Sequence, residues 1–113
     1  MSKYKSKKTV VDGIEFDSKR EARRWLVLRE LEKNGQISDL ERQVKFELIP
    51  AQRRPDGKGK MRVVERAVGY VADFVYIKDG EVVAEDTKGF RTRDYTIKRK
   101  LMLFINNVRV REV

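Results

Sequence analysis

The sequence predicts a single α/β layered domain, and three observations carry that prediction. Several short segments alternate apolar and polar residues, which is typical of strands. Two longer segments carry apolar residues at helical spacing, and turn sequences separate the segments. A chain of 113 residues has room for one domain with one core. We therefore expect a single domain over residues 9–113, preceded by a disordered basic arm over residues 1–8.

The first half of the chain predicts a strand, a helix and a second strand. Residues 9–16 form a strand or hairpin, with the Asp-Gly pair at 12–13 as a turn. The Ser-Lys-Arg-Glu sequence at 18–21 matches the capping box S-x-x-E, so we expect a helix to begin there. The Asn-Gly pair at 34–35 predicts its end, since glycine readily adopts the left-handed conformation. Residues 44–50 then alternate apolar and polar side chains up to a proline, which predicts a strand.

The second half predicts two more strands, a helix and a last strand. Residues 53–60 are basic and rich in glycine, and predict a loop. Residues 61–77 and 82–87 predict two strands joined by a tight turn. Apolar residues at helical spacing predict a helix over about 95–106, and valines predict a strand over 108–113. The predicted order is therefore β-α-β-β-β-α-β.

Composition excludes several kinds of chemistry. The chain has neither histidine nor cysteine, which excludes most zinc sites, thiol nucleophiles and a histidine general base. A metal would have to be held by oxygen atoms, which favours Mg²⁺, with Mn²⁺ as a substitute. A net charge of +9 favours a polyanionic partner such as DNA. With no apolar run of the roughly 20 residues that a membrane span needs, and no signal peptide, we expect a cytoplasmic protein that binds no membrane.

The strongest functional prediction comes from the tight turn. If the Asp-Gly pair at 79–80 forms a two-residue type I′ turn, Asp73 lies directly opposite Asp86. Two like charges at facing positions destabilise a sheet, and a divalent cation would neutralise them. A longer turn would instead place Glu85 opposite Asp73. The competing interpretation is a pair of ordinary surface aspartates.

Two further residues complete the predicted site. Lys88 follows Asp86 by two positions and so projects from the same face of the strand. Two carboxylates that hold a metal, with an ammonium group beside them, suit hydrolysis of a phosphodiester. Glu21 shares a helix stripe with Trp25 and Leu28 and so points inward, where it would join the metal site. The alternative is that Glu21 serves only as the capping-box glutamate.

Three strings carry a resemblance to a known superfamily: FDSKRE at 16–21, YVADF at 70–74 and EDTKG at 85–89. Together they resemble the PD-(D/E)XK nucleases, and more closely a small phage-encoded, resolvase-like family of unknown function within that superfamily. The resemblance covers about residues 9–107 in the order αβββαβ. It implies a restriction-endonuclease-like core, in which two helices flank a mixed central sheet.

The resemblance also implies roles for individual residues. Glu21 corresponds to the helix carboxylate, Asp73 to the motif aspartate, and Asp86 and Lys88 to the D/E-x-K motif. Ala72 stands where the superfamily name has proline. The implied catalytic set is therefore Asp73, Asp86, Lys88 and Glu21, with the three carboxylates as Mg²⁺ ligands and no organic cofactor.

A basic segment follows the predicted site. Residues 89–100 contain five basic residues and one acid, and we expect Arg91, Arg93, Lys98 and Arg99 to contact phosphates. A solvated helix face is the competing interpretation.

The expected function is that of a Mg²⁺-dependent DNA endonuclease. The resemblance implies branched recombination intermediates such as Holliday junctions as the substrate, a homodimer, and the cytoplasm of a bacterial host if the gene is phage-encoded. Restriction-like or repair-like nicking of duplex DNA is the competing choice of substrate. The alternative function is a non-catalytic basic DNA-binding module on a nuclease fold.

Overall fold

A computed structural model describes residues 8–87 and 91–113. Most of the predicted basic arm (residues 1–7) and Lys88 therefore lie outside the described residues. Lys8 is described, and its Nζ lies 3.2 Å from Glu15 Oε1.

The central sheet has four strands in the order β3-β6-β7-β8. Their bounds are β3 Ser38–Ile49, β6 Val68–Lys78, β7 Glu81–Asp86 and β8 Val110–Glu112. Strands β3, β6 and β7 pair antiparallel, whereas β7 and β8 pair parallel. The parallel pair requires a crossover, which a helix between the two strands supplies. The predicted mixed sheet of an α+β domain is confirmed.

Two short hairpins have the predicted turns. Strands β1 (Thr9–Val11) and β2 (Ile14–Phe16) pair around Asp12 and Gly13, whose φ angles are 52° and 76°. Strands β6 and β7 pair around Asp79 and Gly80, whose φ angles are 51° and 77°. Positive φ at both central residues is the requirement of a type I′ turn. This turn sets the register of β6 on β7.

The two helices begin and end near their predicted positions. Helix α1 spans Lys19–Lys33, where the Ser18 side chain caps its N-terminus and Gly35, with φ of 75°, follows its end. Helix α2 spans Arg93–Asn106 and is the crossover from β7 to β8. Within the described ranges, neither helix is long and apolar enough to cross a membrane.

Two hydrophobic clusters hold the helices against the sheet. Trp25 and Leu28 of α1 pack with Phe74 of β6 in one cluster, and Met102 of α2 packs with Ala72 of β6 in the other. The change from one cluster to the other takes place at Asp73. The boundary between the two halves of the core is therefore occupied by a carboxylate.

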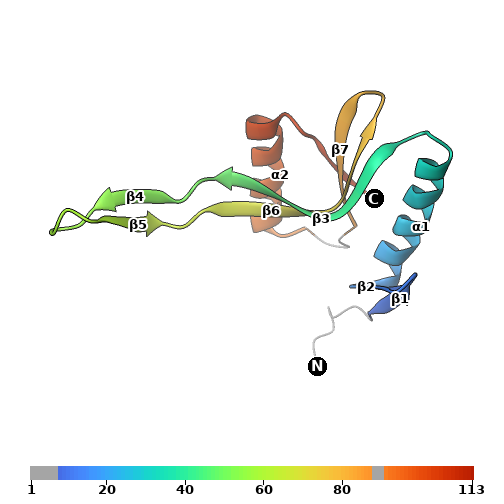
Figure 1. Cartoon of the computed structure of the whole chain (residues 1–113), viewed down its shortest axis with the longest axis horizontal. Helices are drawn as coiled ribbons and strands as arrows, with labels where there is room; N and C mark the ends of the chain where they lie inside the picture. The colour runs from blue at the N-terminus through green and yellow to red at the C-terminus, as the bar shows by residue number, and fades with distance from the viewer. Residues whose placement is uncertain (1–7, 88–90) are drawn as a thin grey trace.

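The predicted loop at 53–60 is wrong over residues 53–55, which belong to a strand. Strands β4 (Gln52–Pro55) and β5 (Met61–Glu65) pair antiparallel, so that only residues 56–60 form the turn. The strand predicted over 61–77 is instead two strands, because β5 pairs with β4 whereas β6 pairs with β3. In Figure 1 the β4–β5 hairpin continues the line of β3 and β6 and projects away from both helices. The radius of gyration is 17.4 Å, against about 13 Å for a compact chain of this length.

Candidate active site

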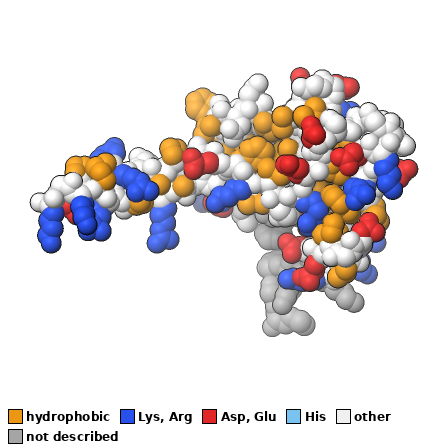
Figure 2. Space-filling model, in the orientation of Figure 1, with side chains coloured by type: hydrophobic (Ala, Val, Ile, Leu, Met, Phe, Trp, Pro, Cys, Tyr) orange, Lys and Arg blue, Asp and Glu red, His pale blue; other side chains and the backbone are white. Residues whose placement is uncertain are grey.

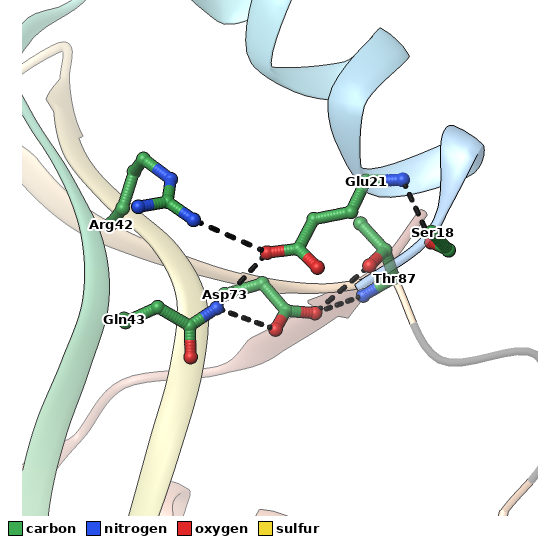
Figure 3. Close-up of polar contacts among 6 residues, drawn as sticks. All are labelled: Ser18, Glu21, Arg42, Gln43, Asp73 and Thr87. Atoms are coloured by element: carbon green, nitrogen blue, oxygen red, sulfur yellow. Dashed lines mark hydrogen bonds and ion pairs between the residues drawn. The ribbon is translucent and has the colours of Figure 1, made fainter. Parts of the chain in front are cut away.

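Glu21 and Asp73 come together through the side chain of Gln43. The amide Nε2 of Gln43 donates to Glu21 Oε1 at 3.0 Å and to Asp73 Oδ1 at 3.3 Å (Figure 3). Gln43 lies in β3 between the Arg42–Phe74 and Val44–Ala72 pairs, and its φ is 50°. The left-handed backbone at this position accompanies the close approach of its side chain to both carboxylates.

The backbone and the side chain of Glu21 have different partners. Its backbone N–H donates to Ser18 Oγ at 3.1 Å, which caps the helix. Its carboxylate points instead toward the sheet, where Gln43 donates to it and Arg42 Nη2 lies 4.0 Å from Oε1 (Figure 3). The inward orientation predicted from the helix stripe is therefore confirmed.

The environment of Glu21 disfavours its charge. Burial raises the pKa of its carboxyl group, and the charges of Asp73 and Asp17 raise it further, whereas Arg42 and Gln43 lower it. Two carboxylates close together in a buried setting are stabilised by a nearby cation. A bound metal ion would reduce the repulsion between the carboxylates of Glu21 and Asp73.

Asp73 also ties the end of β7 to β6. Its Oδ2 accepts hydrogen bonds from the Thr87 N–H at 2.8 Å and from Thr87 Oγ1 at 2.9 Å. Both donors lie on the residue that directly precedes Lys88 in the chain. Asp73 thus fixes the point at which the chain leaves the sheet toward Lys88, which itself lies outside the described residues.

Asp86 occupies the predicted position. Phe74 pairs with Glu85, and Asp86 is therefore level with Asp73, one position further along the two strands. Asp86 is 2% exposed and accepts a hydrogen bond from the Tyr70 hydroxyl at 2.7 Å. Burial, together with this hydrogen bond, raises the pKa of Tyr70 and keeps the phenol a donor. The observed register excludes the alternative in which Glu85 faces Asp73.

Glu85 belongs to a separate network on the other face of β7. It is fully buried, and Arg24 of α1 donates to both of its carboxylate oxygens at 2.7 Å. The Tyr76 hydroxyl donates to Oε2 as well. A bidentate pair of this kind is a structural connection between helix and sheet. The neighbouring carboxylates Glu85 and Asp86 therefore have different surroundings.

The ligand atoms that the candidate site offers fit a hard cation. The carboxylates of Glu21, Asp73 and Asp86 offer only oxygen, as Mg²⁺ and Mn²⁺ require. Within residues 8–87 and 91–113, however, no three acidic residues form a ready-made metal cage. The amide of Gln43 lies between two of these carboxylates, in the place where a cation would neutralise them. Rotation of that amide would offer its own oxygen as a further ligand.

The structure pairs three of the four predicted phosphate contacts with carboxylates. Arg91 forms an ion pair with Glu112, and Arg99 Nη1 lies 3.4 Å from the same residue. Lys98 Nζ lies 3.3 Å from Asp94. Arg93 is exposed at the first position of α2. The DNA contacts of all four residues stay predictions.

Three residues at the site, Tyr70, Thr87 and Gln43, were not predicted from the sequence. Tyr70 and Thr87 lie within the strings that carry the family resemblance, Tyr70 three residues before Asp73 and Thr87 directly after Asp86, and this position could have drawn attention to them. Gln43 has no such signal, because it stands one residue before a segment that reads as an ordinary strand. Its role depends on β3 lying beside β6.

The comparison with protein families gives a match over nearly the whole chain. The model of the family described as "Protein of unknown function (DUF1064)" matches residues 1–112. The chain belongs to this family. Searches of the curated proteins and of the solved structures find no match. The family description assigns no activity, and the likeness to PD-(D/E)XK nucleases remains a resemblance of motifs.

Proposed function

We propose that this protein is a divalent-metal-dependent DNA endonuclease. One observation carries the proposal: Glu21 of α1 and Asp73 of β6 meet at the Gln43 amide, and Asp86 of β7 is level with Asp73 across the two strands. Two of them share a single amide donor, although both are buried.

Each residue has a task in this proposal. Asp73, Asp86 and Glu21 would hold the metal ion, which when bound lowers the pKa of water and polarises the phosphoryl oxygen. Tyr70 orients Asp86 through its hydroxyl, and Thr87 orients Asp73. Lys88 would stabilise the negative charge that develops on the phosphate oxygens.

The proposed substrate is a branched recombination intermediate such as a Holliday junction. This choice rests on the resemblance to resolvase-like proteins, and it implies a homodimer, because two symmetric cuts require two sites. It also implies work in the cytoplasm, where such DNA occurs.

The test is a cleavage assay with a four-way junction, a flap, a linear duplex and a single strand. Each substrate is incubated with Mg²⁺, Mn²⁺ or EDTA. We expect cleavage with either metal, none with EDTA, and the highest rate on the junction. Salt-sensitive binding without cleavage of any substrate would favour the non-catalytic DNA-binding module.

A matched control separates the carboxylate site from a general loss of charge. Asp73→Asn and Asp79→Asn make the same chemical change in one hairpin, at the proposed site and at the turn. Asn tolerates the left-handed conformation that Asp79 adopts. We expect only Asp73→Asn to abolish cleavage. Equal activity in the two variants would remove Asp73 from the proposed metal site.

A further inference from the structure

We propose that the hairpin of residues 51–67, here called the β-arm, is a DNA-binding ribbon that enters the major groove of a duplex. The inference rests on the proposed function in taking DNA as the substrate. It adds a second contact surface, remote from the carboxylates. Five observations support it: charge, the pairing of like charges, a rigid tip, length and an exposed apolar face.

The β-arm is basic. Residues 51–67 contain six basic and two acidic residues, a net charge of +4. Lysine and arginine side chains project from the arm along its length (Figure 2). By contrast, the basic segment after the candidate site is largely paired with carboxylates of α2 and β8. Among the described residues, the arm is thus the better surface for a polyanion.

Two arginines face each other in the arm. Arg54 pairs with Arg62 across β4 and β5, and like charges at facing positions destabilise a ribbon. Asp56 accepts from Arg62 Nε at 3.0 Å and offsets one of the two charges. A DNA phosphate would offset the other, as a cation would for the two aspartates of the sheet.

The tip of the arm is held in one shape by Asp56. Its Oδ1 accepts from the backbone N–H groups of Lys58 and Lys60 at 2.7 and 3.0 Å, and Gly59 supplies the positive φ that the turn needs. All residues of β4 and β5 are exposed. A two-stranded ribbon without a packed face adds little to stability, and a pre-formed tip lowers the entropic cost of binding.

The dimensions of the arm suit duplex DNA. Two strands about 4.8 Å apart fit a major groove about 12 Å wide, whereas the minor groove, about 6 Å wide, is too narrow for a ribbon with side chains. From Gln43 to Arg54, a strand rising about 3.3 Å per residue spans at most roughly 36 Å. This is about one helical turn of DNA. The arm and the carboxylates can therefore contact the same duplex one turn apart.

The face of the arm opposite Arg54 and Arg62 carries apolar side chains that suit the floor of the major groove. Met61 and Val63 are 59% and 47% exposed, and they pair with Pro55 and Arg53. Apolar side chains in the major groove contact the methyl groups of thymine. The arm thus presents apolar and basic side chains side by side.

The test compares two double variants of the full chain. Arg54→Ala/Lys58→Ala removes two arm charges and leaves the Asp56–Arg62 contact intact. Arg23→Ala/Lys33→Ala removes two exposed charges from α1 and is the control. Binding to a duplex of about 30 base pairs, roughly three helical turns, is measured in EDTA by fluorescence anisotropy across a salt series. Thermal melts verify that both variants fold.

We expect the arm variant to flatten the slope of log K against log[salt] by about 1.8, which is about a 30-fold loss of affinity at 0.15 M salt. The control keeps the wild-type slope. Wild-type protein protects guanine N7, a major-groove atom, from methylation at positions that the arm variant leaves reactive.

Four results would overturn the inference. The slope of the arm variant could equal that of the wild type, the two double variants could lose affinity equally, or guanine N7 could stay unprotected. A change in the molar mass of the DNA-free protein that is confined to the arm variant would also overturn it, because the arm would then contact a second copy. Binding in EDTA requires no chemistry, so a failure of the proposed nuclease activity would leave this measurement unaffected.

Discussion

Replacing Arg24 by alanine removes the cation that holds a fully buried carboxylate. Arg24 donates two hydrogen bonds of 2.7 Å to Glu85, whose side chain is 0% exposed. Loss of one partner from a buried ion pair costs about 3–5 kcal/mol, because the remaining charge is left without compensation. The Arg24 side chain is 28% exposed, so water can enter the space it leaves. We therefore expect a value near the lower limit, about 3 kcal/mol.

The measurement is a pair of thermal and urea unfolding curves. For a domain of this size, a loss of about 3 kcal/mol lowers the melting temperature by roughly 12 °C. Arg23→Ala is the matched control, since Arg23 is the exposed neighbour on the same helix, and surface changes stay within about 0.5 kcal/mol. The double change Arg24→Met/Glu85→Leu should recover most of the loss. If Arg24→Ala and Arg23→Ala have the same melting temperature and the same urea midpoint, the network around Glu85 does not stabilise the fold.

Three further outcomes concern the carboxylates and the lysine. Asp73→Asn and Asp86→Asn should each abolish cleavage while the melting temperature stays level or rises, because removing one of two facing charges relieves repulsion; cleavage at the wild-type rate in either variant would end the metal assignment. The pKa of Glu21 is raised above its ordinary value of 4.5, so the folded state binds the proton more tightly than the unfolded state does. The stability of the wild type therefore falls as the pH rises from 4.5 through the pKa of the folded state. Glu21→Gln should therefore gain stability over wild type from pH 4.5 upward and use metal less well, and parallel stability curves for the two proteins would contradict this. Lys88→Ala should bind DNA normally and lose turnover, since its proposed task belongs to the transition state; normal turnover would leave Lys88 without a catalytic role.

Local sequence signals predicted the parts of the fold that depend on local chemistry. The capping box placed the start of α1, because Ser18 offers its hydroxyl to the helix N–H groups whatever the rest of the chain does. The Asp-Gly pair at 79–80 predicted both the turn and the register of two strands. From that register the level positions of Asp73 and Asp86 followed.

Other features depend on contacts between distant segments. Glycine and proline at 55–59 indicated a loop, whereas the pairing of β4 with β5 follows from β3 and β6, which bring the two segments together. Helical spacing located α2, but Ile97 and Phe104 are exposed, and Tyr95 and Met102 are the residues it buries. The ion pairs of Arg91 and Arg99 could not be foreseen, because Glu112 reaches them from the last strand.

The position of the β-arm outside both hydrophobic clusters makes its length a variable that evolution or design can adjust. Adding two residues to each strand lengthens it by about 7 Å and preserves which side chains share a face, whereas adding one residue inverts every face. The core has no part in either change, because no residue between 51 and 67 belongs to a described cluster. If the β-arm binds DNA as proposed, its length would set the distance along the duplex between the groove that the arm contacts and the proposed cleavage site.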